Sequence, residues 1–210
     1  MTMGPIDQAK QADQADQAAQ NAFDADERRR KADMAKPMSS APMKFAEDGS
    51  VDWGNMWDSF CVLASAGGPA HRAIMLEPEA GVRVESQGFQ AAASEIIRGI
   101  FLVSGLRAEM ATAEPGWIAV DCPLNGMADW VADQAVQENV HFRADGNRLL
   151  VPCGEHWTAT GEIKNVITVV AKTTHYFADH IPAEIKSTLA VEEGLNKLGA
   201  LFKGLFGRKK

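Results

Sequence analysis

The sequence predicts an α+β fold in which a ferredoxin-like β-α-β-β-α-β core forms an antiparallel sheet. Segments of helical apolar periodicity alternate along the chain with short apolar runs of strand length. Two pairs of these runs are separated by turn sequences, Glu114-Pro115-Gly116 and Gly146-Asn147, which predict two hairpins. An extra helix precedes the core and a further strand and helix follow it. We expect the helices to cover the sheet.

The length of 210 residues, 46% of them hydrophobic, suits one domain with extensions at both ends. We divide the chain into a polar extension over 1–42, a globular domain over 43–185, and a linker with a basic amphipathic helix over 186–210. Residues 8–20 repeat Gln-Ala without an apolar stripe, which favours a disordered segment or a solvated helix. The run 37–43, PMSSAPM, has the composition of a linker.

The domain opens with apolar residues at intervals of three and four, which predicts a helix with one apolar face. This face consists of Trp53, Met56, Trp57, Phe60 and Cys61. Gly67, Gly68 and Pro69 then end the helix, because glycine permits a left-handed cap and proline cannot continue a helix. The apolar run at 72–77 (RAIMLE) predicts the first strand of the core.

The remaining elements follow in the order helix, hairpin, helix, hairpin, helix. A long helix begins near Phe89 and closes at Gly105. The first hairpin pairs 107–113 with 117–122, and the second pairs 140–145 with 148–153. A helix over 125–138 separates the hairpins, and a last helix runs from about residue 160 to 178.

Composition excludes several classes of function. The net charge of −7 argues against binding of nucleic acid, which needs a basic surface. Three cysteines, an odd number, argue against a disulfide framework and for a reducing compartment. We find no secretory signal and no apolar stretch near the ~20 residues of a membrane span. The sequence therefore predicts a cytoplasmic protein.

The stretch from residue 52 to 72 (DWGNMWDSFCVLASAGGPAHR) contains the first candidate site. Trp53 and Trp57 could offer an aromatic platform, while the backbone amides of Gly67-Gly68 could face an anion. His71 and Arg72 would then clamp a carboxylate or a phosphate. The alternative is a packed helix, its cap and the start of a strand, since tryptophan and cysteine at helical spacing usually lie in a core.

A second candidate site comprises Cys122, Cys153 and His156. Cys153 and His156 form a C-x-x-H pair, which is half of a zinc site, and a thiolate beside a histidine could also be a nucleophile. Cys122 and Cys153 both end predicted strands, so they could meet at one sheet edge if the strands are suitably arranged. The alternative is free buried cysteine. No phosphate-loop, dinucleotide or nucleophile-elbow motif occurs, and we predict no metal and no cofactor.

The strongest signal lies at the C-terminal end, in residues 194–210 (GLNKLGALFKGLFGRKK). At about 100° per residue, its large apolar side chains fall within an arc of roughly 140°. These are Leu195, Leu198, Leu201, Phe202, Leu205 and Phe206. Its five cations are Lys197, Lys203, Arg208, Lys209 and Lys210, and it contains no acid. Removing five positive charges from −7 leaves −12 on residues 1–193, so the sign of the charge changes sharply here.

This tail has the composition of a helix that lies at an interface. Three partners are compatible with it: an anionic membrane surface, a groove on a partner protein, and the chain's own domain. We therefore expect a non-catalytic binding or adaptor protein that attaches through the tail. The alternative is a small-ligand-binding protein or enzyme using one of the two sites above. A homo-oligomer remains open.

Overall fold

The computed structural model describes residues 17–18, 20–27, 29, 36–65, 67 and 69–180, and it confirms a mixed α+β fold. In chain order the elements are η1 (Met38–Ser40), α2 (Trp53–Ser65), α3 (Gln87–Ser104), β1 (Ala108–Met110), β2 (Trp117–Asp121), α4 (Met127–Gln137), β3 (Arg143–Asp145), β4 (Arg148–Pro152) and α5 (Glu162–His180). In the N-terminal extension, residues 20–27 are helical, and Phe23 is 65% exposed. This part of the extension is a solvated helix.

The four strands form one antiparallel sheet in the order β1-β2-β4-β3. Both predicted hairpins are confirmed, since β1 pairs with β2 and β3 pairs with β4. Gly146 takes a φ of 59° in the second hairpin turn, a conformation that glycine adopts readily. The two hairpins join through the five-residue strands β2 and β4, which place Trp117 opposite Pro152 and Asp121 opposite Arg148.

This strand order does not confirm the ferredoxin-like topology, and the predicted strand at 72–77 does not form. Only Leu76 makes a single bridge, parallel to Val140, while Ile74 is 86% exposed. The place beside β2 belongs to β4, which the sequence analysis put outside the core motif. A strand in this place, between β2 and β3, is buried on both faces in this sheet, because the helices cover one face and an apolar cluster around Trp117 lies on the other. The run from Leu149 to Pro152 is buried throughout, whereas 72–77 is mostly exposed.

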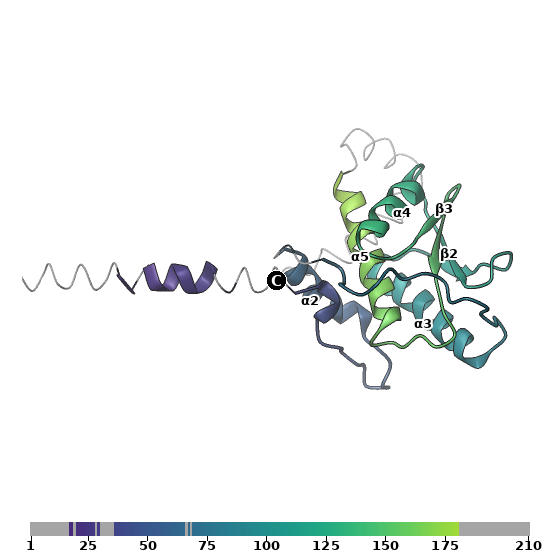
Figure 1. The fold of residues 1–210 in the computed structure, drawn as a ribbon, viewed down its shortest axis with the longest axis horizontal. Coiled ribbons are helices and arrows are strands. Elements are labelled where there is room, and N and C mark those ends of the chain that lie inside the picture. Colours follow the sequence, from purple (N-terminus) through teal and green to yellow (C-terminus); the bar gives the residue numbers. More distant parts are fainter. Residues whose placement is uncertain are drawn as a thin grey trace, which may run out of the picture.

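The helices α3, α4 and α5 gather on one side of the sheet (Figure 1), and α2 packs against α3 and η1, with Trp57 directed toward α5. From the strands, Ile118, Val120, Leu149 and Val151 point into this helical layer and join the main core. The helices meet them with buried residues such as Ile96, Ile100, Val131, Val166 and Ile167. The four helices predicted for the domain all appear, with ends that differ by a few residues, and the helix predicted within 186–210 lies outside the described residues.

The other face of the sheet carries a small apolar cluster of Trp117, Ala119 and Leu150. Charged side chains cover it. The Arg143 guanidinium lies 5.0 Å from the centroid of the Trp117 ring and Nη1 donates to Glu114 at 2.6 Å. Long arginine side chains can cover apolar surface with their stems. This cluster is therefore closed by the protein's own side chains, with Trp117 only 8% exposed.

The packed domain begins earlier than the predicted boundary at residue 43. Met38 and Ala41 are 1% and 2% exposed and belong to the main core. The backbone amide of Met38 donates to Pro69 O at 2.7 Å, and the Lys164 ammonium donates to Ala41 O. Composition suggested a linker here because short Pro- and Ser-rich runs are usually loops. The structure shows instead that η1 is anchored against α2 and α5.

In the part of the chain that the structure describes, we find no helix with the length and apolar character needed to cross a membrane.

Candidate binding pocket between α2 and α5

The two tryptophans of α2 have different surroundings and do not form a common platform. Trp53 is fully buried, and its Nε1 donates to Glu95 Oε1 at 2.7 Å. Trp57 lies one turn later and is 7% exposed, with its ring 5.5 Å from that of His175 on α5 in an edge-on arrangement. Trp53 is therefore a core residue, and Trp57 faces the space between α2 and α5.

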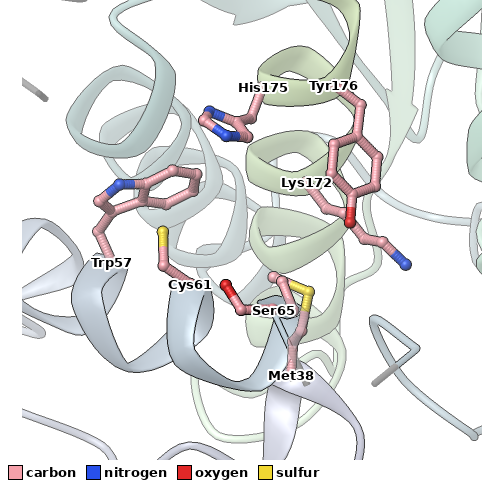
Figure 2. Close-up of a pocket in the computed structure, with 8 residues that line it drawn as sticks. Met38, Trp57, Cys61, Ser65, Lys172, His175 and Tyr176 are labelled. Carbon is pink, nitrogen blue, oxygen red and sulfur yellow. The ribbon is translucent and has the colours of Figure 1, made fainter. Parts of the chain in front are cut away.

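This space is a pocket of about 220 Å³ (Figure 2). It is lined by Met38, Trp57, Cys61, Ala64, Ser65, Lys172, His175 and Tyr176. The wall formed by η1 and α2 is mainly apolar, and the wall formed by α5 is polar. Ligand sites in proteins commonly combine an apolar lining with a few convergent polar groups. The pocket between α2 and α5 has this composition, and its volume is smaller than that of a typical ligand site.

The one cationic residue in the described lining of the pocket, Lys172, is fixed in place by Glu138 and lies near Tyr176. The Lys172 ammonium donates to Glu138 Oε1, and the two side chains are 11% and 16% exposed. Glu138 also accepts a hydrogen bond of 2.8 Å from the amide of Ala70, which fixes its carboxylate. The ammonium lies 5.8 Å from the centroid of the Tyr176 ring. Lys172 is therefore a positioned charge at the edge of the pocket.

The pocket contains a thiol, Cys61, that is unsuited to nucleophilic chemistry. Burial, with a smaller contribution from the Asp58 carboxylate, raises the pKa of Cys61 to about 11. At neutral pH the thiol is protonated, and the thiolate is the reactive form. Cys61 therefore contributes a small apolar surface to the pocket.

The residues after α2 do not join this pocket. Gly67 takes a φ of 84°, and its amide donates to Ala64 O at 2.8 Å, whereas Gly68 lies outside the described residues. His71 is 2% exposed, and its Nδ1 accepts a hydrogen bond of 3.2 Å from the amide of Ala73. Burial lowers the pKa of His71, so its imidazole is neutral at pH 7. Arg72 is exposed, and the two residues offer no shared cationic site inside the protein.

The structure does not bring Cys122 and Cys153 to one sheet edge. The amide of Cys122 donates to Asn147 O and that of Cys153 to Gly116 O, both at 2.8 Å. Because β2 and β4 are antiparallel, the ends of the two strands lie at opposite ends of the sheet. Burial raises the pKa of both thiols to about 12. Over the described ranges, no three His, Cys, Asp or Glu side chains are placed to hold a metal ion.

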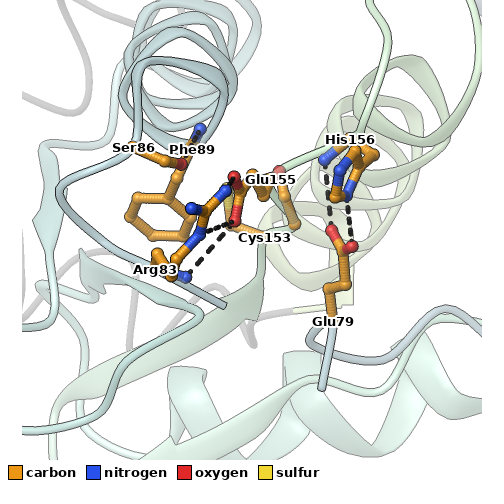
Figure 3. A network of polar contacts seen from close by, with 8 residues as sticks. Glu79, Arg83, Ser86, Phe89, Cys153, Glu155 and His156 are labelled. Carbon is orange, nitrogen blue, oxygen red and sulfur yellow. Dashed lines mark hydrogen bonds and ion pairs between the residues drawn. The ribbon is translucent and has the colours of Figure 1, made fainter. Parts of the chain in front are cut away.

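His156 belongs to a surface network rather than to a site with Cys153 (Figure 3). Its Nδ1 lies 2.5 Å from Glu79 Oε1, and its backbone amide donates to Glu79 Oε2 at 3.1 Å. Arg83 forms an ion pair with Glu155, and its Nε donates to Glu155 Oε2 at 3.3 Å. The His156 side chain is 77% exposed, whereas Cys153 is fully buried. The network fastens the loop before α3 to the segment after β4.

Sequence reasoning missed the α5 wall of the pocket. Lys172, His175 and Tyr176 recur at spacings of three and four, so they share one face of a helix. That spacing was the available signal, but a polar stripe on an amphipathic helix is usually its solvated side. The packing of α2 and η1 beside it distinguishes a pocket wall from a solvated face.

Compared with protein-family models and with curated proteins, the sequence shows no match to any of them. The predicted attachment residues of the tail lie outside the described residues. These are Leu198, Leu201, Phe202, Lys203, Leu205, Phe206, Arg208, Lys209 and Lys210.

Proposed function

We propose that this chain is a non-catalytic binding or adaptor protein of the cytoplasm, which residues 194–210 attach to an anionic membrane surface. The observation that carries the proposal is the change of charge along the chain. Residues 194–210 contain five cations and no acid, while the rest of the chain, at −7 minus those five charges, carries −12. The acidic part is repelled by an anionic surface, so attachment is directed to the tail.

Physical chemistry favours an interfacial position for this segment. Its apolar side chains share one helical face, and the burial of such a face drives binding to a membrane surface. Each cation near an anionic leaflet adds about 1 kcal/mol. Four glycines weaken the free helix, which would then form on contact with the surface. The free state of all three cysteines is consistent with a reducing compartment.

The described domain supports a non-catalytic role through the state of its candidate nucleophiles. Cys61, Cys122 and Cys153 all have raised pKa values because of burial. His71 is buried, and its lowered pKa keeps it neutral. His156 is occupied by Glu79 at the surface, away from a thiol partner. Among the described residues, these candidate nucleophiles and histidines are therefore dispersed, and burial keeps the thiols protonated at neutral pH.

The test is co-sedimentation of the full chain with vesicles of anionic or neutral lipid. We expect the full chain to pellet only with anionic vesicles, and less so as salt rises, since screening weakens the attraction. The truncation 1–193 should remain in the supernatant. A thermal melt of 1–193 close to that of the full chain would show that the loss of binding is not a loss of folding.

A pair of double variants controls for exposed aromatic surface in general. Phe202→Ala with Phe206→Ala should abolish sedimentation. Phe45→Ala with Phe101→Ala removes two phenylalanines of the domain that are 59% and 55% exposed. This second double variant should sediment with anionic vesicles as the wild type does. If the full chain stays in the supernatant with every lipid, the membrane proposal fails. Pull-down with residues 194–210 would then identify a protein groove as the partner.

A further inference from the structure

The pocket between α2 and α5 has a polarity that selects a class of ligand. One wall is formed by Met38, Trp57, Cys61, Ala64 and Ser65, and presents an indole ring, a thioether, a thiol and small groups, with one hydroxyl. The opposite wall presents Lys172, His175 and Tyr176 from successive turns of α5 (Figure 2). A molecule that fills this space meets mainly apolar atoms on the α2 side and hydrogen-bonding groups on the α5 side.

The lining of the pocket, as far as the structure describes it, offers an anion one cationic donor and no carboxylate. Among the described residues that line it, none carries a carboxylate, and one, Lys172, carries a positive charge. Two carboxylates lie outside the lining: Glu138 is paired with Lys172, and Asp58 acts on the thiol of Cys61. An ammonium has three N–H donors, so Lys172 can keep its bond to Glu138 and donate to a second acceptor. A cationic ligand would instead face Lys172 without a partner.

We propose that this pocket binds a small carboxylate with an aromatic or short aliphatic body. The body lies against Trp57, Met38 and Ala64, and the carboxylate faces Lys172 and His175 on α5. Charge-assisted hydrogen bonds to a carboxylate are stronger than neutral ones, and a partly buried site strengthens them further. This site is independent of the tail and goes beyond attachment to a surface.

The volume sets an upper size for the ligand. Drug-sized ligands occupy pockets of about 300–1,000 Å³. The pocket here has about 220 Å³, which suits a single ring or a chain of a few carbons with one carboxylate. Larger acids would have to leave part of their body in solvent.

The test uses three carboxylates, each with its neutral amide of nearly the same shape: benzoate, phenylacetate and hexanoate. Each is titrated into the ¹⁵N-labelled full chain, and the indole N–H signal of Trp57, assigned with Trp57→Phe, is followed. We expect at least one carboxylate to shift this signal and the amides of His175 and Tyr176. Its affinity should be at least tenfold higher than that of its amide.

A matched pair of variants on α2 locates the binding. Ala64→Leu fills the pocket and should reduce the affinity at least tenfold. Val62→Leu alters the same helix at a residue that is 68% exposed and outside the lining, and should leave the affinity unchanged. Both substitutions introduce leucine, a good helix former, so they test the pocket rather than the helix.

The charge is tested by Lys172→Gln, which should remove the preference for carboxylate over amide. This variant could fail to fold, because Glu138 loses its partner. In that case the proposal is still tested by the titrations of carboxylate against amide and by Ala64→Leu against Val62→Leu. The proposal is overturned if none of the three carboxylates shifts the Trp57 signal. It is equally overturned if carboxylate and amide bind alike, or if Ala64→Leu binds as well as the wild type. None of these measurements depends on residues 194–210.

Discussion

At the scale of single residues, Gly99 allows α3 and α5 to pack closely. A Cβ atom added at Gly99 would lie 2.1 Å from Ile167 Cδ1, 2.9 Å from Ile167 Cγ1 and 3.2 Å from Trp53 Nε1. Ile167 is fully buried, so its side chain has little room to move aside. The glycine is therefore required by packing, although glycine within a helix is unfavourable.

We predict that Gly99→Ala destabilises the protein. Helix propensity alone would favour alanine by about 1 kcal/mol, but overpacking a core typically costs about 1–3 kcal/mol. Urea denaturation should therefore show a net loss. Adding Ile167→Val removes the nearest atom, Cδ1, and should recover part of that loss. Gly54→Ala, where the nearest atom lies 3.8 Å away, should be neutral or stabilising. A stabilising Gly99→Ala would contradict this account of the contact.

The two tryptophans of α2 show how far a residue pattern can predict a site. Trp53 and Trp57 lie four apart on one helical face, and their placement toward the protein interior was predictable from that spacing. Which of them would be core and which would line a pocket depends on the position of α5. The segment of α5 that contacts Trp57 lies more than 100 residues away in sequence. No local pattern contains that information.

At the scale of elements, local structure was predictable and long-range pairing was not. The hairpins β1-β2 and β3-β4 follow from turn residues between neighbouring strands. The pairing of β2 with β4 joins two hairpins across α4, and the sequence favoured 72–77 for that place because it is apolar and strand-sized. Leu76 pairs only once, with Val140, so apolar composition alone did not decide which segment became the central strand.

The N-terminal element η1 leads to a prediction about truncation. A chain of residues 36–210 should unfold at nearly the temperature of the full chain, because residues 20–27 are mostly exposed. A chain of residues 43–210 loses the buried Met38 and Ala41. Removing a buried methionine side chain alone costs about 2–5 kcal/mol. The shorter chain should therefore melt well below the longer one.

Met38→Ala in the full chain separates this effect from the loss of chain length. It should reproduce most of the destabilisation, while Phe45→Ala, at a side chain that is 59% exposed, should change stability little. Equal melting temperatures for the two truncations would show that η1 is a dispensable part of a linker.

At the scale of the whole molecule, buried thiols link folding to alkaline pH. Cys122 and Cys153 lie at opposite ends of the central strand pair, and burial raises the pKa of each from 9.0 to about 12. Between these values the unfolded chain loses the thiol protons while the folded chain keeps them. The unfolded state then binds fewer protons, so the free energy of unfolding falls as pH rises above 9.0. Lys164, whose pKa is lowered by burial, acts in the opposite direction.

We predict that the double variant Cys122→Ala with Cys153→Ala loses less stability at high pH than the wild type does. Each thiol contributes a loss of about 1.4 kcal/mol per pH unit within the window. Between pH 7.5 and 10 the wild type should therefore lose about 3 kcal/mol more than the variant does. Urea denaturation at both pH values measures this difference, and the variant's own cavity penalty cancels because it is present at both. The wild type and the variant share Lys164, Cys61 and every other ionisable group, so the contributions of these groups cancel in the comparison. An identical pH dependence would mean that the two thiols ionise as readily in the folded protein as in the unfolded chain, so that burial does not raise their pKa, and this would contradict the prediction.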